Sequence, residues 1–162
     1  MEDGKYLTFE LSGQMYAIDI RCIREILNGH GSISPVPEFP EYSLGVINLR
    51  GDIVPIIDMR KRFHKPPIEG SHKECIIVTE SSNSGADYIG FSVDKVSSVM
   101  DFEGKDISAA PKLTSNGRKY VTGMYKADGR IIIILDTDLL LTDSMVEAIG
   151  EYMGNLGLNS DE

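Results

Sequence analysis

The sequence predicts a mainly β protein built from two copies of one small five-stranded barrel. Three observations carry this prediction. Isoleucine and valine together number 28, whereas leucine and alanine number 18, and β-branched side chains favour pleated strands over helices. Apolar and polar residues alternate along much of the chain. The two halves of the chain also share one pattern of apolar, glycine and aspartate positions.

The N-terminal segment is expected to form a β-hairpin followed by a short helix. Residues 6–11 and 16–20 alternate in polarity on either side of a Ser12-Gly13-Gln14 turn. From Ile20 onward, apolar residues fall at the i, i+3, i+6 and i+7 positions of a short amphipathic helix, which Asn28-Gly29 would end.

The middle of the chain is expected to be extended, with one further short helix. Residues 33–40 hold three prolines and predict an extended edge segment. A second short helix is expected over residues 41–48, and strands over residues 53–60, 75–79 and 131–135. The last of these is the most apolar and is expected to be buried.

The internal repeat consists of three aligned pairs of segments in the same order. The pairs are YAIDIRCIREI (16–26) with IGFSVDKVSSV (89–99), ISPVP (33–37) with ISAAP (107–111), and GVINLRGDIVPIIDMR (45–60) with GMYKADGRIIIILDTD (123–138). The last pair shares the identities Gly45/Gly123, Gly51/Gly129, Ile53/Ile131, Ile56/Ile134 and Asp58/Asp136. Composition alone would give about one such identity. We therefore expect a first barrel over roughly residues 14–83 and a second over roughly 84–142, with the first strand shared between them; a single irregular sandwich is the alternative.

Charge and hydropathy exclude several classes of function. The net charge is 16 − 25 = −9, which disfavours binding to nucleic acid or anionic lipid. The longest apolar run, residues 131–135, is too short to span a membrane, and the N-terminus lacks a signal-peptide pattern, so a cytoplasmic protein is expected. Residues 143–162 hold five acids and no base, and predict an acidic helix beginning at Asp143 or Ser144 with a flexible tail after it.

No arrangement of residues predicts an enzyme. His30, His64 and His72 fall in loops and are interpreted as solvated, and Cys22 and Cys75 as reduced thiols. Asp136 and Asp138 suggest a divalent-cation site for a small hydrolase. Because Asp58 aligns with Asp136, however, a structural role at the end of a strand explains both aspartates. We expect no metal and no cofactor.

One group of cations and one single arginine suggest protein contacts. Arg60, Lys61, Arg62 and Lys65 would steer an acidic partner or else form a solvated strand end. Arg50 lies in an Asn-Leu-Arg-Gly turn where the second copy has Asp128. A charge that reverses between copies is not needed by the shared fold, so Arg50 suits a specific contact with carboxylates or carbonyls of a partner. The alternative is an exposed arginine with a local partner.

The segment GVINLRGDIVPIIDMRKRF, with YAIDIRCIREIL and ISPVP before it and YIGFSVDKVSSVM and YVTGMYKADGRIIIILD after it, resembles the CheW family of chemotaxis coupling proteins. The resemblance covers about residues 6–141 and implies one CheW-like domain over residues 1–142, a pair of intertwined SH3-like barrels. It implies a non-enzymatic adaptor that couples chemoreceptor cytoplasmic tips to the regulatory domain of a CheA-type histidine kinase. An array component that packs with receptors without activating the kinase is the alternative. Because only about twenty residues follow, a stand-alone coupling protein fits better than a CheV-type protein with a receiver domain.

The resemblance also implies site residues. A receptor hairpin is expected to lie along a groove between the barrels. The implied receptor-binding residues are Ile23, Glu25 and Ile26 on a helix-like segment, Gly45, Asn48 and Arg50 in the turn, and Val96 and Val99 in the second barrel. The implied kinase-binding residues are Cys75, Ile76, Ser108 and Leu113.

Overall fold

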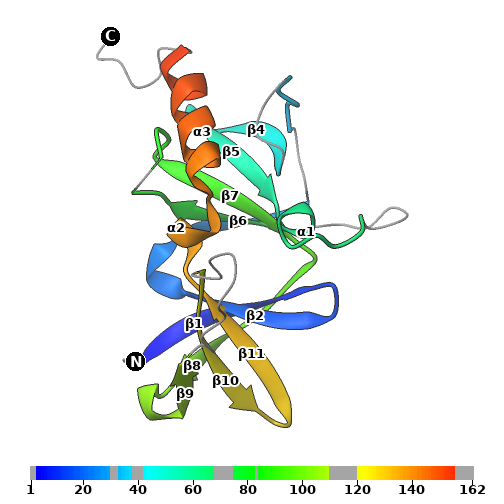
Figure 1. Cartoon of the computed structure of the whole chain (residues 1–162), viewed down its shortest axis with the longest axis vertical. Helices are drawn as coiled ribbons and strands as arrows, with labels where there is room; N and C mark the ends of the chain where they lie inside the picture. Colours follow the sequence, from blue (N-terminus) through cyan, green and yellow to red (C-terminus); the bar gives the residue numbers. More distant parts are fainter. Residues whose placement is uncertain are drawn as a thin grey trace. The chain divides into compact units, whose positions relative to one another are not determined.

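The computed structural model describes residues 3–29, 33–37, 42–67, 75–82, 84–109 and 120–155 (Figure 1). The chain divides into two compact units. Unit 1 comprises Met1–Cys22 and Asp94–Leu140, and unit 2 comprises Ile23–Val93 and Leu141–Glu162. Each unit contains one sheet and few helical residues, so the predicted mainly β fold class is confirmed.

Unit 1 is built on a six-stranded sheet. Its strands are β1 (Gly4–Leu11), β2 (Gln14–Asp19), β8 (Lys95–Phe102), β9 (Ile107–Ala109), β10 (Val121–Ala127) and β11 (Arg130–Leu135). They lie in the order β8-β1-β2-β11-β10-β9, and all neighbours are antiparallel except β11 and β2. Short 3₁₀ turns at Ile20–Cys22 and Gly104–Asp106, and the one-turn helix α2 (Thr137–Leu140), complete the unit. The predicted first hairpin, β1-β2, is confirmed.

Unit 2 is built on a five-stranded sheet with the same plan. Its strands are β3 (Ile23–Asn28), β4 (Ser43–Leu49), β5 (Asp52–Asp58), β6 (Cys75–Glu80) and β7 (Tyr88–Val93). Their order is β3-β6-β7-β5-β4, in which only β5 and β7 are parallel. The helices are α1 (Met59–Arg62) and α3 (Asp143–Asn155).

The internal repeat is visible in the pairing of the strands. The hairpin β6-β7 corresponds to β1-β2, and the parallel pair β5/β7 corresponds to β11/β2. Unit 1 therefore combines the hairpin β1-β2 of the first copy of the repeat with strands β8 to β11 of the second copy. Unit 2 combines the hairpin β6-β7 of the second copy with strands β3, β4 and β5 of the first. The compact units consequently alternate along the chain and do not follow the consecutive boundaries expected, 14–83 and 84–142. A repeat in sequence shows which segments are alike, but not which copies pair.

Equivalent short segments lie beside β4 and β10. Ser34 and Val46 exchange two backbone hydrogen bonds of 2.8 and 2.9 Å. Ser108 lies opposite Met124 in the antiparallel pair of β9 and β10. In unit 1, β8 and β9 occupy opposite ends of the sheet order, yet only residues 103–106 separate them. Five residue steps span at most about 18 Å, so this sheet must curl back on itself, as a barrel does.

Two predicted helices are strands in the structure. Only Ile20–Cys22 is helical in the first segment, and residues from Ile23 onward form β3. A bulge between Ile23 and Glu25 inserts an extra residue opposite β6, so the apolar side chains at 23 and 26 are three apart and imitate a helical period. The second predicted helix, over residues 41–48, falls on β4, which carries a bulge between Ser43 and Gly45.

One predicted strand is shorter than expected, and another is less buried. The strand expected over 53–60 ends at Asp58, where α1 begins. Along β11, Ile132 and Ile134 are buried in the core, whereas Ile131 is 48% exposed. The apolar run 131–135 is thus buried mainly on one face of the sheet.

The predicted C-terminal helix is confirmed as α3. Its buried residues are Met145, Ile149 and Met153. The backbones of Gly85 and Gly150 approach so closely that a Cβ on Gly85 would lie 2.7 Å from the Gly150 Cα. The expected flexible tail lies outside the described residues. Within the described ranges, no helix has the length and apolar character needed to cross a membrane.

Candidate functional site

The Asn-Leu-Arg-Gly segment forms the tight turn between β4 and β5. Arg50 (φ 51°) and Gly51 (φ 93°) both have positive φ, as in the two-residue type I′ hairpin turn. The Asn48 Oδ1 accepts a 2.9 Å hydrogen bond from the Gly51 N–H and holds the turn in shape. The turn presents the Arg50 side chain, which is 70% exposed.

Arg50 forms a two-pronged ion pair with Glu25 of β3. Arg50 Nη1 donates to Glu25 Oε1 at 2.6 Å, and Nη2 donates to Oε2 at 3.2 Å. Because β3 and β4 occupy opposite ends of the sheet order, this pair joins the two ends of the unit 2 sheet. The hydrogen bonds from Arg50 lower the pKa of Glu25, and those same bonds raise the pKa of Arg50. Both groups are therefore charged at neutral pH.

Unit 1 has the same turn without the ion pair. Asp128 (φ 49°) and Gly129 (φ 77°) repeat the geometry of Arg50 and Gly51. The position aligned with Glu25 is Ser98, whose N–H donates to Thr8 Oγ1 at 3.2 Å while that hydroxyl donates to the Ser98 carbonyl at 2.8 Å. The turn therefore forms with either charge. The expected local partner of Arg50 exists, and most of the Arg50 side chain nevertheless remains exposed.

Gly45 has a structural role beside this turn. Its φ is 133°, and a Cβ here would overlap the Ser34 carbonyl oxygen and lie 2.9 Å from the Pro35 Cα. Glycine thus permits the bulge of β4 at which Ser34 pairs with Val46. Gly45 is buried, so it shapes the surface without being part of it.

The four apolar residues implied for the receptor surface divide between the units. Ile23 and Ile26 lie on β3 of unit 2, which is a strand and not the helix-like segment expected; Val96 and Val99 lie on β8 of unit 1. Ile26 is 38% exposed and Val99 is 48% exposed, at equivalent positions of the repeat. Both strands lie at one end of their sheet order. Each unit therefore exposes one apolar side chain on an equivalent strand.

The residues implied for the kinase surface have different environments. Ser108 is exposed on β9, and Cys75 is half-buried at the start of β6 with its thiol 3.9 Å from the Asn28 Oδ1. Ile76 is fully buried in the unit 2 core, so its role is packing. Leu113 lies outside the described residues.

Asp58 and Asp136 both cap the one-turn helix that follows a strand. Asp58 Oδ1 accepts from the Arg60 N–H at 3.0 Å, and Asp136 Oδ1 accepts from the Asp138 N–H at 3.0 Å. Each aspartate also donates its own N–H to a tyrosine carbonyl, Tyr42 at 2.7 Å and Tyr120 at 2.8 Å respectively. This confirms the structural interpretation of both aspartates.

The other suggested metal and catalytic groups give no site within the ranges that the structure covers. There, no group of three or more His, Cys, Asp or Glu side chains is arranged to hold a metal ion. His64 lies on an exposed loop, as expected. His30 and His72 lie outside the described residues.

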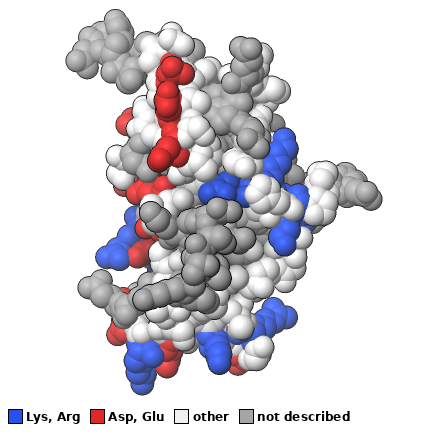
Figure 2. Space-filling view, in the orientation of Figure 1, with Lys and Arg blue, Asp and Glu red and all other residues white. Residues whose placement is uncertain are grey.

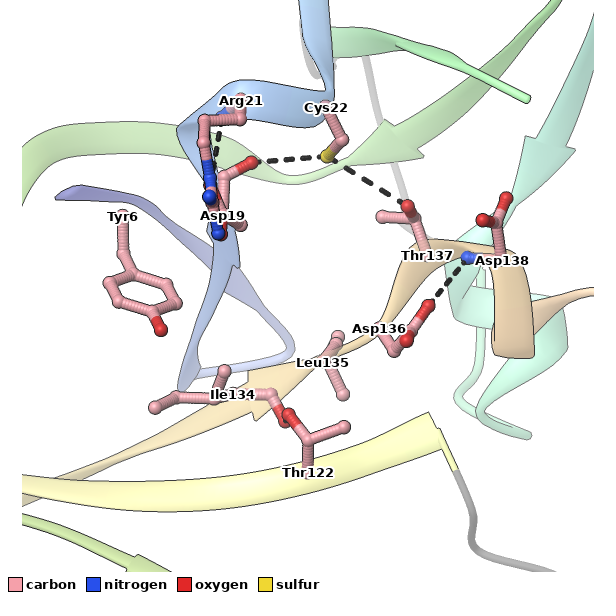
Figure 3. Close-up of a pocket in the computed structure, with 10 residues that line it drawn as sticks. All are labelled: Tyr6, Asp19, Arg21, Cys22, Thr122, Ile134, Leu135, Asp136, Thr137 and Asp138. Atoms are coloured by element: carbon pink, nitrogen blue, oxygen red, sulfur yellow. Dashed lines mark hydrogen bonds and ion pairs between the residues drawn. The ribbon is translucent and has the colours of Figure 1, made fainter. Parts of the chain in front are cut away.

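Unit 1 contains a pocket of about 460 Å³ (Figure 3). It is lined by Tyr6, Asp19, Arg21, Cys22, Thr122, Ile134, Leu135, Asp136, Thr137 and Asp138. The Cys22 thiol donates to the Asp19 carbonyl at 3.1 Å and accepts from the Thr137 hydroxyl at 3.8 Å. Burial raises the pKa of Cys22 to about 11, so the group is an unreactive thiol at neutral pH. Arg21 binds the Asp19 carboxylate at 2.7 Å and lowers its pKa.

Sequence reasoning missed this pocket. Asp19 and Arg21, two residues apart at the end of β2, were a usable signal for the ion pair. Thr137 gave none, because its partner Cys22 lies 115 residues away. The Asp19, Arg21, Cys22 and Thr137 side chains of the pocket are thus engaged with one another, and Cys22 is no activated nucleophile.

Exposed turns, strands with exposed apolar side chains and surface ion pairs are features typical of a protein-binding module. The family model for the CheW-like domain matches residues 5–145, and the chain belongs to the CheW family. It is 30% identical over 147 residues to a probable chemotaxis protein CheW of Rhizobium etli, covering 90% of this chain and 92% of that protein. It is 33% identical over 139 residues to the chemotaxis protein CheW of Klebsiella aerogenes, covering 85% and 81%.

The fold agrees with a solved structure of the same family. The crystal structure of the scaffolding protein TtCheW from Thermoanaerobacter tengcongensis matches with a TM-score of 0.77 and 32% identity, covering 88% of this chain and 94% of that one. The chain is accordingly a chemotaxis coupling adaptor of the scaffolding type. The family does not favour the metal-dependent hydrolase considered for Asp136 and Asp138.

Proposed function

We propose that this adaptor couples the cytoplasmic tip of a methyl-accepting chemoreceptor to the regulatory domain of a CheA-type histidine kinase. It acts by binding alone, without catalysis or a cofactor, in the cytoplasm and on receptor arrays through its partners. The single observation that carries the proposal is the Arg50–Glu25 pair on the Asn-Leu-Arg-Gly turn. This turn is one of the motifs that carry the family resemblance.

The residues proposed to bind the receptor lie in the turn of unit 2 and on the strand of each unit that exposes an apolar side chain. Arg50 is held by Glu25 and still has most of its side chain exposed, so little side-chain entropy is lost when a partner carbonyl or carboxylate binds it. Ile26 and Val99 supply apolar contacts for the face of a receptor helix. Ile23 and Val96 support them from half-buried positions, and Gly45 and Asn48 maintain the turn.

The residues proposed to bind the kinase are Cys75 on β6 of unit 2 and Ser108 on β9 of unit 1, together with Leu113, five residues after Ser108 in the sequence. Ser108 is exposed and Cys75 half-buried, so both are accessible to a partner. Ile76 contributes by fixing the start of β6 in the core.

A reconstitution assay tests the proposed function. Kinase autophosphorylation is measured with receptor-containing membranes and the cognate kinase, with and without this protein. Coupling predicts that receptor control of the kinase appears only when the protein is added. An assembly that forms without any change in kinase activity would show instead an array component that packs without activating.

A further inference from the structure

Four cations gather around α1 in a protein of net charge −9. We call Arg60, Lys61, Arg62 and Lys65 the α1 cation cluster. Asp58 caps α1, and Met59 anchors it with a fully buried side chain, so the cluster is displayed on a fixed turn of unit 2. Figure 2 shows blue side chains gathered over the region of α1 and a red stripe along α3.

Each arginine of the cluster has a described contact with an uncharged neighbour. Arg60 Nη1 donates to the Pro66 carbonyl at 2.6 Å. The guanidinium of Arg62 lies 5.6 Å from the centre of the Tyr42 ring, a cation–π distance. A partner would therefore meet guanidinium groups whose positions are largely set.

The two lysines of the cluster have no acidic partner in the structurally described ranges. Lys61 and Lys65 are both exposed, and neither ammonium group lies within ion-pair distance of a carboxylate there. Both lysines thus lie exposed on unit 2, whereas Arg50 is already held by Glu25.

The cluster lies far from the Asn-Leu-Arg-Gly turn. That turn precedes Asp52 at the start of β5, and α1 follows Asp58 at its end. Six residue steps of a strand span roughly 20 Å. A partner contact centred on Arg50 therefore leaves the cluster open to a second contact.

The chemistry favours carboxylates of a protein over phosphates of a nucleic acid. A duplex presents a long polyanion, which a chain of net charge −9 repels beyond the cluster itself. A short acidic segment avoids this repulsion, because its charges fit within the cluster. We propose that the α1 cation cluster docks a short acidic segment of a protein partner, as a contact separate from the receptor and kinase surfaces.

The test measures binding of a short synthetic poly-glutamate peptide to the full chain by calorimetry, at low and at physiological ionic strength. We expect saturable binding that weakens with salt and falls about tenfold or more in the double variant Lys61→Glu/Lys65→Glu. The control is Lys95→Glu/Lys126→Glu, which makes the same change in net charge at two exposed lysines of unit 1. It should weaken binding less than about threefold.

Other outcomes overturn the proposal. Equal weakening in both double variants would reveal only a general charge effect, absent binding would remove the site, and tighter binding of duplex DNA would assign the cluster to nucleic acid.

Sedimentation of the chain alone adds one supporting outcome. The wild type would self-associate, and the variant Lys61→Glu/Lys65→Glu would not. If mixing that variant with Glu147→Lys/Glu151→Lys restored the association, the acidic segment would lie on α3 of a second copy. The result does not depend on receptor coupling, which the Arg50 variants report separately.

Discussion

Arg50 and Glu25 are joined by two hydrogen bonds, of 2.6 and 3.2 Å, between the β4-β5 turn and β3. The pair links opposite ends of the unit 2 sheet, and its equivalent in unit 1 is replaced by Asp128 and Ser98. Both turns nevertheless have the same type I′ backbone. The ion pair is therefore a feature added to the shared fold, and it places an exposed, oriented guanidinium on unit 2.

Replacing Arg50 with glutamate should weaken receptor coupling and leave the fold intact. The turn tolerates an acidic residue, as Asp128 demonstrates, but the new carboxylate would face Glu25 and could not donate to a partner. We expect a cooperative melt close to that of the wild type and a loss of receptor binding of about tenfold or more in a pull-down with receptor fragments. Arg130→Glu, an exposed arginine of unit 1, is the control. An unfolded variant, or one that couples normally, would contradict the assignment.

The Arg50–Glu25 pair should stabilise the fold only at pH values at which the Glu25 carboxyl is ionised. Since Arg50 lowers the pKa of Glu25 in the folded state, the contribution is fully present above the pKa of glutamate in the unfolded chain and disappears as the pH falls through the folded value. The melting temperatures of the wild type and Arg50→Gln should therefore differ at neutral pH and converge below about pH 4.3. The difference should be small, because Arg50 is 70% exposed. A difference that grows with acidity would exclude this linkage.

The sequence predicted the repeat, the first hairpin, a structural role for Asp58 and Asp136 at the ends of strands, and the C-terminal helix, because each depends on local pattern. It failed where tertiary pairing overrode that pattern. Ile23 and Ile26 have helical spacing only because a bulge inserts a residue into β3. The exchange of hairpins between the copies left no local signal. The turn position of Arg50 and its reversed charge relative to Asp128 single it out in the sequence. Its partner Glu25 lies 25 residues away, and the family resemblance names Glu25 only as a receptor-binding residue.

Gly45→Ala should destabilise the protein much more than Gly129→Ala. Both glycines have positive φ, which costs an alanine about 1–2 kcal/mol. Only at Gly45 would the Cβ meet backbone, at Ser34 and Pro35, while nothing lies within 4 Å at Gly129. Chemical denaturation of both variants measures the difference. Equal losses of stability would show that the approach of Ser34 to β4 does not require glycine.

Ile134→Asp should prevent folding, whereas Ile131→Asp should be tolerated. Ile134 is 2% exposed in the unit 1 core, and Ile131 on the other face of the same strand is 48% exposed. An unpaired buried charge costs several kcal/mol, against a total stability of about 5–15 kcal/mol for a typical domain. Circular dichroism and a thermal melt distinguish the two variants. A soluble Ile134→Asp protein that melts cooperatively would contradict the described burial of β11.

Asp136→Ala should lower stability by about 1 kcal/mol, the usual value of a helix N-cap, without affecting coupling. The loss arises because the Asp138 and Leu139 N–H groups lose their acceptor. Asp87→Ala, at an exposed loop aspartate, is the control and should melt like the wild type. If Asp136→Ala instead abolished a metal-dependent hydrolytic activity, the capping role would be an incomplete account of Asp136.

The most direct test of the central claim is a calorimetric titration of this protein with the regulatory domain of its cognate CheA-type kinase, and then with a receptor-tip fragment. The account predicts saturable binding to both, with Arg50→Glu weakening receptor binding and leaving kinase binding close to that of the wild type. Absence of binding to both partners, or equal damage to both by Arg50→Glu, would contradict a coupler with two separate surfaces.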